Sequence, residues 1–160
     1  MYRKFLIELT PIPMNDIQTI VVETDEQTRV ALRMALRSQP GIEVACEATN
    51  GTTGLVLLES IDVDVAIVNM ALPDMSIEEF TQKMRDLQED GGVIQSHLFI
   101  LVDPQNCPDG ETIWALQASG YGRTNAPIEE MAEAIRQIYA GKQYIDPSIA
   151  PLFPLSFSTK

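Results

Sequence analysis

The sequence has little of what metal-binding and disulfide-stabilised proteins need. Only two cysteines, Cys46 and Cys107, and one histidine, His97, occur in its 160 residues. They form no CxxC pair and no Cys/His cluster, which argues against a structural zinc site and against a disulfide framework. We therefore predict no metal and no cofactor, and we interpret Cys46 as a small core residue.

Long apolar runs and positive charge are also scarce. No run approaches the ~20 apolar residues of a transmembrane helix, and Glu8, Pro11 and Pro13 break the first segment where a signal peptide would be continuously apolar. The 11 basic residues face 23 acidic ones, which gives a net charge of −12. Such an acidic surface repels phosphate backbones. We expect a cytoplasmic protein whose domain contacts neither nucleic acid nor membrane directly.

One group of basic residues is ordered. Arg29, Arg33 and Arg37 recur at every fourth position and would form a ridge on a helix. A solvated helix face is the simpler interpretation of this ridge, and a docking stripe for an acidic partner is the alternative.

Apolar runs typical of buried strands alternate with helical patterns. We predict strands at 17–23, 42–48, 63–68, 97–102 and 120–123, and helices at 24–38, 52–60, 109–118 and 127–140. A further helix should run from the capping box Ser76-x-x-Glu79 to Gly91-Gly92, and Thr24-x-x-Gln27 is a second capping box. The order (βα)₅ predicts an α/β fold with a five-stranded, doubly wound parallel sheet of flavodoxin-like type.

Parallel sheets place their sites at the carboxyl ends of the strands. Here those ends are Glu23-Thr24, Asn69, Val102-Asp103 and Arg123-Thr124. Asn69 is the most informative of these, because it is a polar residue delivered by an apolar run. An enzyme on a flavodoxin-like sheet is not expected, since no glycine-rich phosphate loop follows the first strand.

Six short motifs follow one another at characteristic spacings. They are Arg29-x-x-Leu32-Arg33, Pro40-Gly41-Ile42-Glu43-Val44, Glu47-Ala48-Thr49-Asn50-Gly51, Leu72-Pro73-Asp74-Met75, Ala132-Glu133-Ala134-Ile135 and Tyr144-Ile145-Asp146-Pro147. No single motif is specific. Their order and spacing together resemble the receiver domain of two-component response regulators, in the subfamily with a helix-turn-helix output, over residues 17–150.

The resemblance implies Mg²⁺-assisted phosphoryl transfer to an aspartate. In the family, two acidic residues after the first strand and the acceptor hold the metal, while a Ser/Thr and a Lys bind the phosphoryl oxygens. This chain departs at these positions, which carry Glu23-Thr24, Asn69, Val102 and either Thr124 or Arg123. Counting forward from Gly120-Tyr121 places the Lys position on Thr124, and counting back from Pro127 places it on Arg123.

These departures predict a pseudo-receiver that has lost phosphotransfer and is not an enzyme. An amide at position 69 has no carboxylate oxygen to attack phosphorus, and Val102 cannot bond a phosphoryl oxygen. Asp25 and Asp74 lie nearby as conceivable substitute ligands, although helix-start and turn roles explain them more simply. In the forward count Tyr121 takes the place of the family's switch aromatic, and an amphipathic surface tyrosine is the alternative.

We divide the chain into an N-terminal extension (1–15), a receiver-like domain (16–141) and a C-terminal tail (142–160). The tail resembles the segment that leads into the family's DNA-binding domain, and its apolar part could pack on the domain or cover a partner site. We predict a phosphorylation-independent signalling module that acts through protein–protein contacts, including a homodimer. The alternative is the receiver part of a DNA-binding transcription regulator whose output domain is missing.

Overall fold

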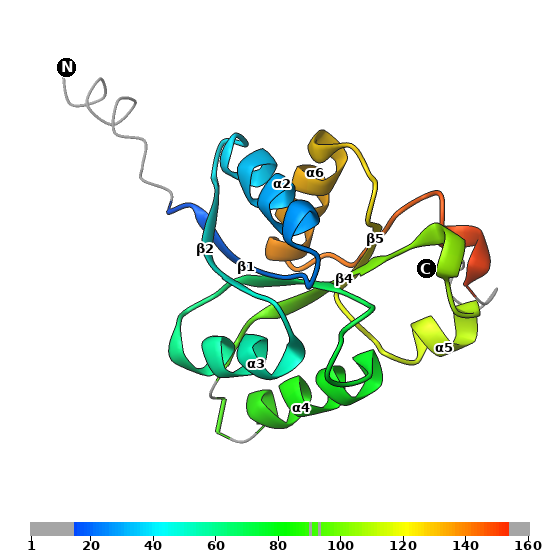
Figure 1. Ribbon diagram of the computed structural model, residues 1–160, viewed down its shortest axis with the longest axis horizontal. Helices are drawn as coiled ribbons and strands as arrows, with labels where there is room; N and C mark the ends of the chain where they lie inside the picture. The colour runs from blue at the N-terminus through cyan, green and yellow to red at the C-terminus, as the bar shows by residue number, and fades with distance from the viewer. Residues whose placement is uncertain (1–14, 90, 93, 154–160) are drawn as a thin grey trace, which may run out of the picture.

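The computed structural model describes residues 15–89, 91–92 and 94–153 (Figure 1). Its elements are β1 (Ile17–Val22), α2 (Glu26–Arg37), β2 (Ile42–Ala48), α3 (Gly51–Ser60), β3 (Val65–Asn69), α4 (Ile77–Glu89), β4 (His97–Val102), η1 (Pro104–Asn106), α5 (Gly110–Trp114), β5 (Gly120–Arg123), α6 (Ile128–Tyr139), β6 (Tyr144–Ile145) and η2 (Ala150–Leu152). In the part of the chain that the structure covers, no helix is both long enough and apolar enough to span a bilayer.

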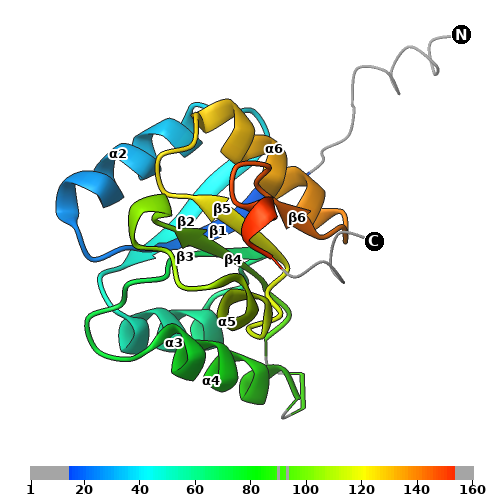
Figure 2. The same ribbon diagram turned by 90° about the vertical axis from the view of Figure 1, so that its right-hand side faces the viewer.

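The strands form one parallel sheet in the order β2-β1-β3-β4-β5-β6. Figures 1 and 2 show α2 and α6 side by side on one face and α3 and α4 on the other. The predicted flavodoxin-like receiver fold is confirmed, with one strand more than the five expected. The additional strand, β6, pairs with β5 through Gly120–Tyr144 and Tyr121–Ile145.

Each face of the sheet carries its own apolar core. Beneath α2 and α6, the buried residues include Leu36, Ile135 and Ile138. Beneath α3 and α4, they include Phe80 and Met84. Since both faces are covered, the central strands are apolar along almost their whole length, as parallel sheets require.

The two predicted capping boxes have different outcomes. Ser76 caps α4 as expected, because its Oγ accepts the backbone N–H of Glu79 at 3.0 Å. The prediction for Thr24 is wrong, since Asp25 caps α2 by accepting the N–H of Thr28 at 2.8 Å. The Thr24 hydroxyl instead donates to the carbonyl of Thr49 at 2.8 Å.

The segment after α6 folds back onto the domain. Ile149 and Phe153 are buried there, and the Phe153 ring makes edge-to-face contacts with Tyr121 (5.2 Å between centroids) and Trp114 (6.1 Å). Gly110 permits this approach, because a Cβ at that position would overlap the carbonyl of Leu152. The first part of the predicted tail therefore packs on the domain, whereas residues 1–14 and 154–160 lie outside the described chain.

Candidate functional site

The carboxyl ends of the strands meet at one edge of the sheet. Glu23 follows β1, Asn69 ends β3 and Val102 ends β4. Parallel pairing places Asn69 beside Leu101, and the N–H of Thr124 donates to the carbonyl of Val102 at 3.1 Å. The residues predicted from the sequence are thus brought together where parallel sheets form their sites.

Asn69 and Glu23 form the centre of this edge. The Asn69 Nδ2 donates to Glu23 Oε1 at 2.7 Å, and its Oδ1 accepts the N–H of Ala71 at 2.8 Å. The second Glu23 oxygen accepts the N–H of Asp25 at 2.9 Å. Both ends of the Asn69 amide are therefore committed, and the buried Glu23 carboxylate is held by neutral donors.

The residues present do not fit a divalent metal ion. Such an ion prefers several oxygen ligands, with carboxylates among them. Glu23 is the one carboxylate that bonds to Asn69, and the Thr24 hydroxyl is engaged by Thr49. Within the described ranges, no three His, Cys, Asp or Glu side chains cluster as ligands would.

Asp25 and Asp74 organise helix starts. The side chain and backbone of Thr28 bond to Asp25 and lower the pKa of its carboxyl. Asp74 accepts the N–H groups of Gly51 and Thr52, both at 2.9 Å, and the Thr52 hydroxyl at 2.6 Å. That hydroxyl is the main reason why the pKa of Asp74 falls to about 2. These contacts favour the structural interpretation of both carboxylates over a metal-binding one.

Arg123 and Thr124 lie on different sides of the domain edge. Arg123 turns toward the C-terminal segment, where its Nε bonds to Asp146 Oδ2 at 2.9 Å and its Nη2 approaches Glu130 at 3.2 Å. Thr124 lines the same groove as Glu23. The geometry therefore supports the forward count, in which Thr124 takes the Lys position.

Tyr121 is fully buried, so the alternative of a surface tyrosine is wrong. Its hydroxyl donates to the carbonyl of Ile113 at 3.0 Å and accepts the N–H of Ala118 at 2.9 Å. Burial raises the pKa of this phenol. The ring is fixed inward by these bonds and by Phe153, contacts that do not involve Val102.

The arginine ridge is tied to the chain's own β2. Glu47 pairs with Arg29 Nε at 3.3 Å and with Arg33 Nη1 at 2.6 Å, and all three side chains are partly buried. Arg37 is exposed. Arg29 and Arg33 therefore fit neither the solvated face nor the docking stripe, because both pair with Glu47 of the same chain. The spacing of the arginines alone could not reveal this partner.

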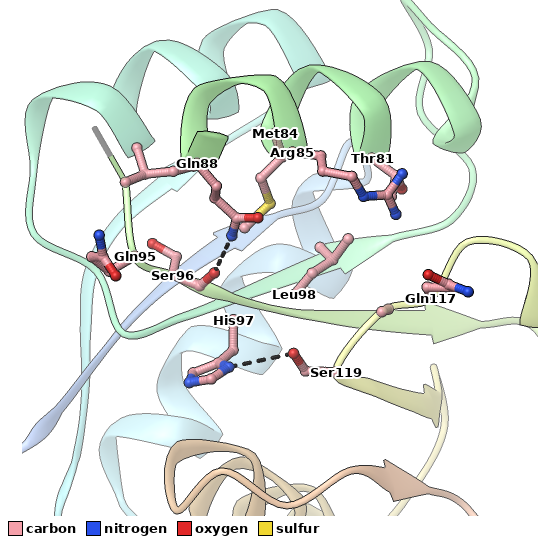
Figure 3. A pocket seen from close by; sticks show the side chains of 12 residues that line it. Thr81, Met84, Arg85, Gln88, Gln95, Ser96, His97, Leu98, Gln117 and Ser119 are labelled. Carbon is pink, nitrogen blue, oxygen red and sulfur yellow. Dashed lines mark hydrogen bonds between the residues drawn. The ribbon is translucent and has the colours of Figure 1, made fainter. Parts of the chain in front are cut away.

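A second concavity, of about 330 Å³, opens at the amino end of β4 (Figure 3). Figure 3 shows Arg85 and Gln88 on the α4 side of the strand and His97 with Ser119 on the other. Arg85 donates to the carbonyl of Leu116 and Gln88 to that of Ser96, both at 2.8 Å. These side chains satisfy the protein's own backbone, which is a structural role.

Comparisons with known proteins agree with this architecture. No protein-family model matches the chain. It is 29% identical over 134 residues to the response regulator GacA of Pseudomonas aeruginosa, covering 84% of this chain and 60% of GacA. It thus spans less than two thirds of that relative's length.

Two solved structures share the fold. One is a LuxR-family two-component response regulator from Aurantimonas sp. SI85-9A1, with a TM-score of 0.74, 21% identity and coverage of 91% of this chain and all of that one. The other shows RcsB dimers bound to DNA, with a TM-score of 0.71, 15% identity and coverage of 86% and 68%. The chain is therefore similar in sequence to a response regulator and shares the fold of these two solved structures.

Proposed function

We propose that this receiver-like chain is a pseudo-receiver, a regulatory module that works without phosphorylation and through contacts with other proteins. The observation that carries the proposal is the Asn69 amide, which donates to Glu23 at the position where the receiver family has its acceptor aspartate. An amide nitrogen or carbonyl oxygen engaged in this way offers no nucleophile to a phosphodonor.

The neighbouring side chains support the same proposal. Thr24, Val102 and Thr124 are all uncharged, so the edge has lost the groups that would hold a metal ion and neutralise a phosphoryl group. Tyr121 is held inward by Ile113, Ala118 and Phe153 without help from Val102. In such a module, a partner that binds one conformation of the edge better than another would set its state.

Protein partners and a cytoplasmic location are part of the proposal. RcsB, which shares the fold, assembles as dimers on DNA, and a homodimer of the present chain is the first partner to test. Direct contact of this domain with nucleic acid is not expected, because the net charge of −12 opposes it.

The test is incubation with a small phosphodonor, such as acetyl phosphate, and Mg²⁺, followed by intact-mass measurement. We expect no phosphoryl adduct on the native protein, while a receiver domain that carries the family's acceptor aspartate serves as a positive control under the same conditions. An Asn69→Asp variant should also label poorly, since Val102 and Thr124 remain. A stable phosphoryl adduct on the native chain would overturn the proposal.

A second candidate function is the receiver part of a DNA-binding transcription regulator. It is favoured by the greater length of GacA, of which the matched region is 60%, and by the resemblance of the segment after α6 to a regulator's linker. The coding sequence after Lys160 decides between the two. A helix-turn-helix region encoded there favours the regulator, and an immediate stop codon removes this candidate.

A further inference from the structure

A groove of about 400 Å³ runs between α2 and α6 and ends beside the candidate site. Figures 1 and 2 show these two helices side by side over one face of the sheet. The carboxylates of Glu23 and Asp25 and the hydroxyl of Thr124 line its polar end, whereas Ala31, Leu32, Leu101 and Met131 line its apolar part. The volume lies within the range of pockets that bind small molecules, which is roughly 300–1,000 Å³.

Glu23 lies at the polar end of the groove without a cationic partner. The residue is only 5% exposed, and its two carboxylate oxygens accept bonds from the Asn69 amide and the Asp25 backbone. No ion pair of Glu23 occurs among the residues that the structure describes. Burying a carboxylate costs free energy unless a positive charge compensates it, so a cation that reaches Glu23 from the groove would be favoured.

Arg29 does not fill this role. Its Nη1 bonds to the backbone carbonyls of Glu23 and Thr24 at 3.0 and 3.3 Å, and its Nε pairs with Glu47. The guanidinium is therefore directed to main-chain oxygens and to β2. Arg29 therefore forms no ion pair with the Glu23 carboxylate, which lines the groove.

The residues that line the groove also determine which class of ligand fits beside Glu23. A bare Mg²⁺ ion prefers several oxygen ligands, and it would find only two carboxylates in the described lining: Glu23, which accepts bonds from Asn69 and the Asp25 backbone, and Asp25, which accepts bonds from Thr28. An anion would be repelled by Glu23 and by the overall charge of −12. An apolar body, by contrast, would be buried against Leu32, Leu101 and Met131.

We propose that the groove between α2 and α6 binds a small organic cation. An ammonium or guanidinium head lies at Glu23, and an apolar body lies along Leu32, Leu101 and Met131. This ligand site goes beyond the proposed function, because it requires neither phosphotransfer nor a protein partner.

The probe is 4-phenylbutylamine, titrated into the whole chain by calorimetry and followed by amide chemical shifts. The matched compounds are 4-phenylbutanoate and 4-phenylbutanol, and MgCl₂ tests the bare ion. We expect the amine to bind and to shift amides of α2, α6 and residues 23–25, while the other three do not. Glu23→Gln should weaken the binding of 4-phenylbutylamine by at least about tenfold, because a charge-assisted hydrogen bond is lost.

A pair of lysine variants tests the position of the charge. Thr124→Lys places an ammonium group in the groove, where it should pair with Glu23 and abolish amine binding. Asn125→Lys adds the same charge at the next residue, which is exposed, and should retain binding within about twofold of the native chain. Circular dichroism confirms the fold of each variant.

Three results would overturn the proposal. The first is absence of amine binding to the native chain, and the second is equal binding of the alcohol, which would mean that the charge is not recognised. The third is equal weakening by Thr124→Lys and Asn125→Lys, which would assign the effect to net charge. If Glu23→Gln does not fold, the lysine pair alone decides.

Discussion

Removing the Phe153 ring should destabilise the whole domain, although the residue lies outside the (βα)₅ unit. Phe153 is 7% exposed and contacts both Tyr121 and Trp114 edge to face. Truncating a buried Phe to Ala typically costs 3–5 kcal/mol, and we expect about 3 kcal/mol for Phe153→Ala because the residue lies at the margin of the core. For a chain of this size, that loss lowers the melting temperature by roughly 6–12 °C.

The assay is urea denaturation of the native chain and Phe153→Ala, followed by far-UV circular dichroism and by tryptophan emission. Trp114 is the only tryptophan, so its emission should shift to longer wavelength when the neighbouring ring is removed. The control is Leu152→Ala, since Leu152 is 47% exposed and should change the free energy of unfolding by no more than about 0.5 kcal/mol. If Phe153→Ala behaves like Leu152→Ala and the emission does not shift, the docking of this segment does not contribute to stability.

Three further predictions concern single polar contacts. Tyr121→Phe leaves the Ala118 N–H and the Ile113 carbonyl without their buried partner, and it should cost about 1–3 kcal/mol of unfolding free energy, measured by urea denaturation. Arg123→Ala removes the cation that pairs with the buried carboxylate of Asp146, which is 1% exposed, and should lower the free energy of unfolding by about 2 kcal/mol. Glu130→Ala removes the exposed partner of the same arginine and should lower it by no more than about 0.5 kcal/mol. The folded-state pKa of Asp74 is lowered from 3.8 to about 2, so its contribution to stability is present above pH 4 and is lost as the pH falls through 2. The melting temperatures of the native chain and Asp74→Asn should therefore differ at pH 6 and converge near pH 2. A constant difference across this range would contradict the role given to Asp74.

The interior of the fold could be predicted from the sequence because local patterns determine it. The strands at 42–48, 97–102 and 120–123 were predicted with their observed bounds. The cap of α2 was predicted at Thr24 and found at Asp25. Both residue types are good helix caps, and the path of the chain decides which one is used. The short β6 could not be predicted, since a two-residue strand carries no periodicity and exists only through its pairing with β5.

The residues of the candidate site could be named from the sequence, but their side-chain contacts could not. The strand ends identified Glu23, Asn69 and Val102, because apolar runs lead directly to them. Counting could not decide between Arg123 and Thr124. The structure separates them through Asp146, which lies 23 residues after Arg123 and draws that side chain away. The groove between α2 and α6 has no sequence signal, since its apolar lining comes from ordinary helix and strand positions.

The two outer strands limit how molecules of this protein can associate. An open sheet edge is a template on which another chain can add a strand. On one side the edge strand β6 has two residues, and Pro147 follows it closely. On the other side β2 carries the exposed acidic side chain of Glu43, whereas Glu47 is paired with Arg29 and Arg33. Within the described part of the chain, a second copy would therefore meet a two-residue edge strand or one that presents the Glu43 carboxylate. Addition of strands at either edge is disfavoured, so stable association should occur through helix surfaces.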